Sequence, residues 1–278
     1  MTLSFAVQEA TGPNGAIGDL VLIHGWGMHC GVFGQCLDHW RQNFRLLTLD
    51  LPGHGKNHQH SMTSTMSQLC DEVILALDQI SPAASAPIWL GWSLGGQVAM
   101  TIALTHPQRV SRLILASSTA RFVAGSDWPH GMADDVFASF AEELKSDHQA
   151  TWKRFLMLEA HGAKTARQDL RELQSLAAQY PAPSQKTLSC GLQLLRETDL
   201  RNQASELTQP CLVISGQRDR LVPPSAAQWL ADHLPQGQLE LMDRCGHAPF
   251  IGDPHRFTQR VKSFAQPDRT SQPQVGHV

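Results

Sequence analysis

The 278 residues are enough for one large domain or two small ones, and their 42% hydrophobic and 17% charged fractions suit a globular core. A formal net charge of −3 gives no support for nucleic acid or a membrane surface as partner. No apolar run approaches the ~20 residues needed to cross a bilayer, and the first residues lack the pattern of a signal peptide.

The six cysteines are scattered along the chain, without a Cys-x-x-Cys pair. Several lie in apolar surroundings, where cysteine usually behaves as a small buried hydrophobic residue. We therefore expect reduced thiols and a cytoplasmic protein.

The first 120 residues alternate predicted strands with predicted helices. Apolar runs bounded by turn residues predict the strands, and apolar residues at helical spacing predict the helices. The predicted strands are 3–8, 19–23, 45–49, 88–90 and 110–116, and the predicted helices are 32–40, 66–80 and the segment after Gly96. Such alternation predicts an α/β fold, with a mostly parallel sheet and helices on both faces.

Between residues 121 and 200 the pattern is helical, and it predicts an insertion rather than a separate domain. The predicted helices are 134–144, 149–160, 165–178 and 184–195. The alternation then resumes, with strands at 211–215 and 238–242 and helices at 225–234 and 254–264. We predict one domain over residues 1–265, with a core of 1–120 and 201–265, a helical lid of 121–200, and a disordered tail over 266–278.

The segment from Ile88 to Gly96 carries the strongest functional motif. Its apolar start predicts a buried strand, Gly91-Trp92-Ser93-Leu94-Gly95 is a Gly-x-Ser-x-Gly motif, and helical residues follow. A strand, a tight turn and a helix in this order are the context of a nucleophile elbow, with a strained serine at the bend and small residues around it. The alternative is a glycine-rich turn whose serine caps the helix.

A serine nucleophile needs a base, and the base needs an orienting acid. In folds of this kind the chain order is serine, acid, histidine. Asp219 follows the predicted strand 211–215, and His247 follows the predicted strand 238–242. All three residues therefore come after the C-terminal ends of strands, which is where open α/β sheets bind ligands. Taken singly, Asp219 could form a turn and His247 could pack in the core.

The oxyanion of an acyl-transfer reaction needs hydrogen-bond donors. The backbone N–H of Leu94 and that of Trp26, in the loop after the second strand, are the candidates. His24 is expected to shape this loop rather than to titrate. Trp26 and Trp92 flank the predicted site, either as core residues or as walls of an apolar acyl pocket.

The histidines at 54, 58 and 60 are a possible metal cluster, but they lie in a polar stretch without a nearby cysteine or an i, i+4 pair. We interpret this stretch as a solvated loop.

Together these residues resemble the α/β-hydrolase superfamily and, within it, the pimeloyl-[acyl-carrier protein] methyl ester esterase family of biotin synthesis. The resemblance covers nearly all of residues 18–260, and its main segments are 24–27, 89–96, 102–107, 154–156, 165–169 and 247–250. The segments within the helical insertion are the specific ones, because lids diverge between superfamily members, whereas many hydrolases share the elbow.

The resemblance implies a serine carboxylesterase that cleaves the methyl ester of pimeloyl-[acyl-carrier protein] without a metal or an organic cofactor. It implies a catalytic triad of Ser93, Asp219 and His247. The residues implied to contact substrate are Trp26, Ser93, Leu94, Phe155, Leu156, Met157, Leu158, Glu159 and His247. The chain has Glu159 where the family commonly has glutamine.

The resemblance further implies that lid arginines hold the acidic carrier protein. Arg167 and Arg171 are four residues apart on a predicted helix and so share one face, which Arg154 joins if its helix packs beside theirs. The alternative is a solvated helix face, and the chain has Ala150 where the family has another lid arginine. We expect a monomer.

Three alternatives to this function share the scaffold, because fold does not decide function. They are a general short-acyl carboxylesterase, a carbon–carbon bond hydrolase, and a ligand receptor that keeps the triad but barely turns over.

Overall fold

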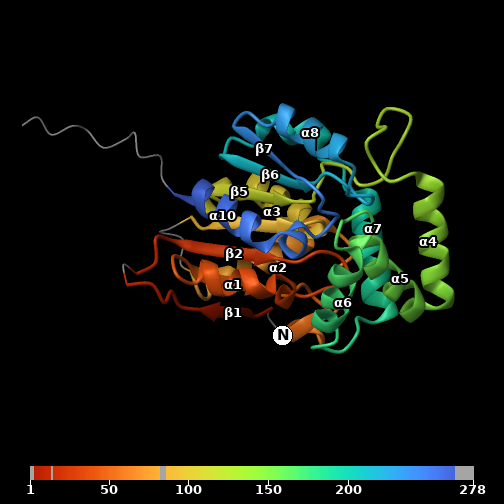
Figure 1. Cartoon of the computed structure of the whole chain (residues 1–278), viewed down its shortest axis with the longest axis horizontal. Coiled ribbons are helices and arrows are strands. Elements are labelled where there is room, and N and C mark those ends of the chain that lie inside the picture. The colour runs from red at the N-terminus through yellow and green to blue at the C-terminus, as the bar shows by residue number, and fades with distance from the viewer. Residues whose placement is uncertain (1–2, 14, 82–85, 267–278) are drawn as a thin grey trace, which may run out of the picture.

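The computed structural model describes residues 3–13, 15–81 and 86–266. Its centre is a seven-stranded sheet in the order β1-β3-β2-β4-β5-β6-β7, in which only β1 is antiparallel to its neighbour (Figure 1). The strands are β1 (Phe5–Gln8), β2 (Asp19–Ile23), β3 (Arg45–Leu49), β4 (Ile88–Trp92), β5 (Arg112–Ala116), β6 (Cys211–Gly216) and β7 (Gly237–Met242). The predicted mostly parallel α/β sheet is confirmed.

Helices cover both faces of this sheet, because successive residues of each central strand enter different cores. Leu20 and Leu22 of β2 belong to the core that includes residues of α1 and α10, whereas Val21 and Ile23 belong to the core that includes residues of α2, α3 and α8. These helices are α1 (Gly34–Trp40), α2 (Met66–Asp78), α3 (Leu94–Thr105), α8 (Pro224–His233), α9 (Pro249–Gly252) and α10 (Pro254–Ala265). The near-continuous apolar strands are typical of a sheet buried on both faces.

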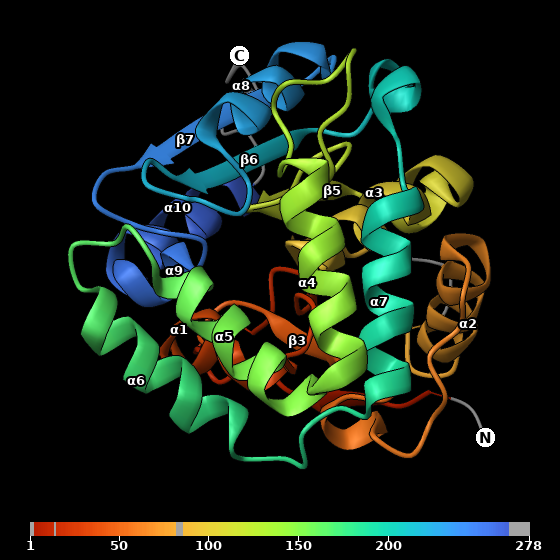
Figure 2. The ribbon, with the colours of Figure 1, turned by 90° about the vertical axis from the view of Figure 1, so that its right-hand side faces the viewer.

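Four further helices lie within residues 121–200, the segment predicted as a lid, and Figure 2 shows them in front of one end of the sheet. They are α4 (Asp134–Ser146), α5 (His148–Ala160), α6 (Ala166–Ala177) and α7 (Gln185–Glu197). Side-chain caps define two of their starts: Asp147 accepts from the Ala150 amide before α5, and Ser184 accepts from the Thr187 amide before α7.

Some predicted bounds differ from the structure. β4 extends to Trp92 instead of ending at Leu90, and β5 begins at Arg112 instead of Val110. Residues 267–278, predicted as a disordered tail, lie outside the described residues. The sequence did not predict α9 or the short 3-10 helices, which are η1 (Cys30–Phe33), η2 (Gly55–Asn57), η3 (Pro107–Arg109) and η4 (Arg201–Glu206). Among the helices described, none is long and apolar enough to cross a membrane.

Candidate active site

Ser93 lies at a strained bend between β4 and α3. Its φ of 54° and ψ of −116° are unusual for a residue with a side chain, and such strain persists where the surroundings enforce it. A Cβ on Gly91 would meet the Gly95 carbonyl, and one on Gly95 would lie 2.5 Å from the Ile23 carbonyl oxygen. The glycines of the motif therefore let β4, α3 and the end of β2 approach closely enough to form the elbow.

Asp219 and His247 are brought together by the loops after β6 and β7. The His247 Nδ1 lies 2.8 Å from Asp219 Oδ2, and both side chains are fully buried. The other Asp219 oxygen accepts hydrogen bonds from the amides of Leu221 and Val222, each at 2.9 Å. The carboxylate is thus held by its own turn while it orients the imidazole. Two other aspartates follow strand ends: Asp50 accepts hydrogen bonds from the amides of Cys30 and Lys56, and Asp243 is exposed.

The His247 ring lies beside the elbow. The indole of Trp92 donates to the His247 carbonyl at 2.9 Å, and the two rings are 5.7 Å apart. Trp92 is fully buried and also packs against Phe250, so the core interpretation of this tryptophan fits its surroundings. The His247 Nε2 is buried and has no hydrogen-bond partner among the described residues. Catalytic hydrogen bonds are often long before substrate binds, and this nitrogen is the one a triad uses to accept the serine proton.

The loop after β2 passes directly over the elbow. A Cβ on Gly25 would lie 3.1 Å from the Cβ of Ser93, so the backbone preceding Trp26 is packed against the candidate nucleophile. Leu94 is the first residue of α3, and the first amides of a helix have no acceptor within it. The two amides predicted as oxyanion donors thus come from segments that meet at Ser93.

His24 fastens this loop to the loop after β3. Its Nε2 accepts from the Leu51 amide at 2.8 Å, so its Nδ1 carries the proton and donates to the Gly25 carbonyl at 2.7 Å. Burial lowers the pKa of His24 to about 3, so the ring stays neutral, as expected for a residue that shapes the loop.

The loop that carries His54 is not solvated throughout, and the prediction was wrong on this point. His54 is buried against the His24 ring, and its Nδ1 donates to the Pro52 carbonyl at 2.9 Å. His58, by contrast, is exposed. The loop folds inward because Gly53 packs under Thr187 of α7, where a Cβ would overlap the threonine side chain.

Glu159 adds a second buried carboxyl group close to the segment that carries His247. Its carbonyl oxygen accepts from the His247 amide at 3.1 Å, and its side chain is only 1% exposed. The Oε2 atom is buried without a hydrogen-bond partner among the described residues. Burial raises the pKa of the Glu159 carboxyl well above its usual range, and the charge of Asp219 raises it further. The Glu159 carboxyl therefore keeps its proton to a higher pH than an exposed glutamate does.

Replacing Glu159 by glutamine should stabilise the fold increasingly as pH rises. The unfolded carboxyl ionises near pH 4.3, whereas the folded one keeps its proton to a higher pH, so in this window the folded state binds more protons and loses stability with increasing pH. Glutamine removes that loss, which amounts to about 1.4 kcal/mol of unfolding free energy per pH unit between the pKa values of the unfolded and folded states. Thermal unfolding of Glu159→Gln at pH 5 and pH 8 measures the gain.

Glu206 is exposed on η4 and serves as the matched control, because the same change there alters no buried side chain. Glu206→Gln should change the unfolding temperature little at either pH. A Glu159→Gln gain that is equal at both pH values would contradict a raised pKa of Glu159.

The side chains of residues 155–159 of α5, which were predicted to contact substrate, point in several directions. Phe155 packs edge-to-face on Trp26 with ring centroids 4.7 Å apart, whereas Leu156 belongs to the core on the other face. Met157 is 48% exposed. Phe155 and Leu158 line a cavity of about 20 Å³ between α4, α5 and α7. A cavity of this size holds about one water molecule.

The three lid arginines do not form one cluster. Arg154 forms an ion pair with Glu143 of α4, on the side of α5 that faces away from α6. Arg167 and Arg171 are both exposed on α6. The basic residue of α5 on the α6 side is Lys153, which lines a groove of about 360 Å³ together with Gln174. Arg154 was predicted to join the α6 arginines if its helix packed beside theirs. The two helices do pack together, but Arg154 pairs with Glu143 of α4 instead.

Sequence comparisons identify relatives along nearly the whole chain. A family model described as Serine aminopeptidase, S33, matches residues 15–254. The chain is 40% identical to the pimeloyl-[acyl-carrier protein] methyl ester esterase of Yersinia enterocolitica, over 91% of this chain and 95% of that protein. It is 40% identical to the protein of the same name from Nitrosomonas europaea, over 90% of this chain and 95% of that protein. It is 42% identical to the one from Pectobacterium atrosepticum, over 89% of this chain and 94% of that protein.

Solved structures show the same fold at low sequence identity. An esterase from Exiguobacterium antarcticum superposes with a TM-score of 0.80 at 22% identity, covering 94% of both chains. A bromoperoxidase from Bacillus anthracis superposes with a TM-score of 0.83 at 19% identity, again covering 94% of both chains. These neighbours share the architecture of the sheet and its helices.

Proposed function

The chain belongs to the α/β-hydrolase family of the pimeloyl-[acyl-carrier protein] methyl ester esterases, and we propose that it hydrolyses this ester to methanol and pimeloyl-[acyl-carrier protein]. The observation that carries the proposal is 40% identity to esterases of that name along 95% of their length. The match includes the lid, which is the part that differs most between hydrolases of one fold. The resemblance that the motifs indicated is thereby confirmed at the level of the family.

The geometry supports a serine mechanism. His247 Nε2 takes the proton of Ser93 as the Ser93 oxygen attacks the ester carbonyl, and Asp219 stabilises the resulting imidazolium. The amides of Trp26 and Leu94 stabilise the oxyanion. His247 then gives its proton to the departing methoxide, which leaves as methanol. Water cleaves the acyl-serine by the same route, and the acyl chain leaves with a free carboxylate.

A comparison of two substrates tests this function. The purified protein should turn over methyl pimeloyl-[acyl-carrier protein] with a higher kcat/KM than a p-nitrophenyl ester of a short acid. The reverse order would favour the general short-acyl carboxylesterase. A burst of p-nitrophenol without steady-state turnover would favour the receptor.

The carrier protein is proposed to dock across the α5–α6 hairpin. Arg167, Arg171 and Gln174 recur at helical spacing on one stripe of α6, and Gln174 borders the groove that Lys153 also lines. The floor of this groove is apolar, with Trp152 and Leu156 among its residues. A row of exposed cations beside an apolar groove suits an acidic protein that delivers an extended acyl thioester.

Reversing the charge at Lys153, Arg167 and Arg171 should raise KM for the carrier-protein substrate by about tenfold or more, because exposed charges steer and hold a charged partner. Turnover of the small p-nitrophenyl ester should hardly change, since that substrate needs no docking surface. Lys145→Glu is the matched control, because Lys145 is exposed on α4 away from α6. Equal damage to both substrates would instead indicate a structural role for the three residues.

A further inference from the structure

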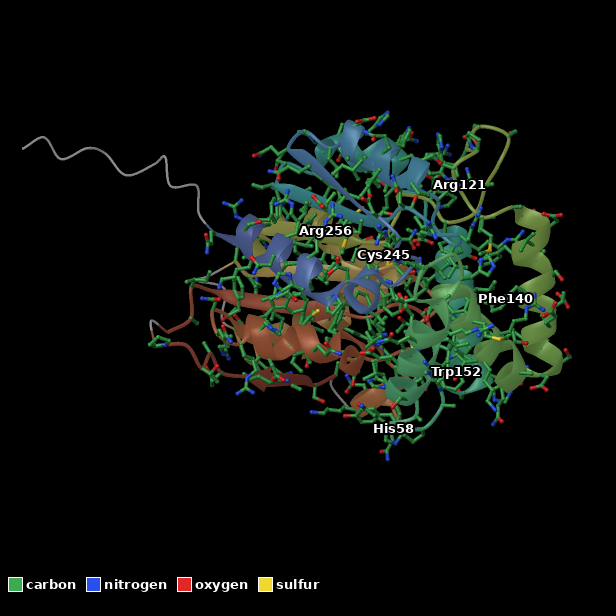
Figure 3. All side chains as sticks on the ribbon, viewed as in Figure 1. His58, Arg121, Phe140, Trp152, Cys245 and Arg256 are labelled. Carbon is green, nitrogen blue, oxygen red and sulfur yellow. The ribbon has the colours of Figure 1, made fainter. Side chains whose placement is uncertain are left out.

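Two indole hydrogen bonds join the lid to the loop after β2. The Nε1 of Trp26, in the loop, donates to the Leu188 carbonyl of α7 at 2.9 Å. In the other direction, the Nε1 of Trp152, on α5, donates to the Gly27 carbonyl of the loop at 2.8 Å. Each element thus supplies one tryptophan donor and one carbonyl acceptor. Figure 3 shows both Trp152 and Phe140 on the lid side of the molecule.

Each indole also lies against a glycine of the opposite element. A Cβ on Gly27 would be 2.9 Å from the Trp152 ring, and Gly27 has a φ of 72°, which favours glycine. A Cβ on Gly191 of α7 would be 2.6 Å from Cδ1 of Trp26. The loop and the lid therefore interlock closely, with no room for a side chain at either contact.

The ring of Trp26 is held by three lid helices. Besides its bond to α7, it packs edge-to-face on Phe155 of α5 and on Phe140 of α4, with centroids 4.7 and 5.7 Å apart. Only 1% of Trp26 is exposed. The lid thus restrains the backbone after Trp26 through the Gly27 carbonyl, while His24 restrains the backbone before it through the Gly25 carbonyl.

We propose that Trp152 is a positioning residue that holds the Trp26 amide in the oxyanion hole by fastening Gly27 to the lid. The inference rests on the proposed esterase mechanism, in which that amide is an oxyanion donor. Such a donor stabilises the transition state only when it is held at hydrogen-bond distance from the developing charge. The lid then completes the catalytic site as well as covering it, and every ester substrate depends on the Trp152 bond, including one too small to dock on the lid.

The test uses Trp152→Phe in the full chain, which keeps an aromatic ring but removes the N–H donor. With p-nitrophenyl butyrate, kcat should fall by about 10- to 100-fold, as expected for a misplaced oxyanion donor, while KM changes little. The dissociation constant of butaneboronic acid, which forms a tetrahedral adduct with a catalytic serine, should rise by a similar factor. A purely structural role would not weaken boronate binding in parallel with kcat.

Two further variants keep the test decisive. Gly191→Ala acts on the other indole, and it should lower kcat and boronate affinity as Trp152→Phe does. Trp229→Phe is the control, because Trp229 lies on α8 and contacts Trp128 and His233 instead of the loop. The proposal is overturned if Trp152→Phe leaves kcat and boronate affinity unchanged, or if Trp229→Phe lowers them equally. Wild-type turnover of p-nitrophenyl butyrate in the same assay shows separately that the esterase mechanism holds.

Discussion

Ser93→Ala should lower kcat for ester hydrolysis by about a millionfold while leaving the fold intact. Loss of the nucleophile removes the covalent route, and the oxyanion hole and substrate binding retain about 10³- to 10⁴-fold acceleration over water. Alanine keeps the Cβ, so the strain at φ 54° is the same in both proteins. Turnover of methyl pimeloyl-[acyl-carrier protein] measures the loss, and thermal unfolding checks the fold.

Ser117 offers a closely matched control. It is buried just after β5, the strand beside β4, and it also has a positive φ, of 44°. Its hydroxyl has no hydrogen-bond partner among the described residues. Ser117→Ala should therefore keep turnover within a few-fold of wild type. If Ser93→Ala retained wild-type turnover, the serine mechanism would be wrong.

The sheet could be predicted from sequence because its strands are short apolar runs with polar or turn residues at their ends. The bounds of β2 and β3 agree with the prediction, since Asp19 and Arg45 begin the runs and Asp50 follows one of them. β4 was predicted too short because Gly91 looks like the start of a turn. In the structure Gly91 still pairs within the sheet, and the bend begins only at Ser93.

The contact between Asp219 and His247 was predictable because chain order and strand ends bring such residues to one edge of the sheet. The ion-pair partner of Arg154 could not be predicted, because it depends on how α4 crosses α5. The burial of Glu159 was equally hidden, since a single charged residue in a helix usually faces solvent. Nothing in the sequence could indicate that Trp152 bonds to Gly27, because an indole donor to a loop carbonyl has no local pattern.

Asp219→Asn should lower kcat by about 10⁴-fold with little loss of stability, as an acid-to-amide change does in a serine triad. Asparagine keeps an oxygen that accepts from the amides of Leu221 and Val222, so the turn after β6 is preserved. The amide nitrogen then occupies the position that faces His247 Nδ1 and donates to it. This favours the tautomer with the proton on Nε2, which cannot accept the proton of Ser93.

The loss is measured as kcat on methyl pimeloyl-[acyl-carrier protein] and on p-nitrophenyl butyrate, and both should fall alike because the chemical step is the same. Asp243→Asn is the control: Asp243 follows β7 only four residues before His247, but it is exposed. Its replacement should leave kcat within a few-fold of wild type. Undiminished turnover in Asp219→Asn would mean that another group orients His247.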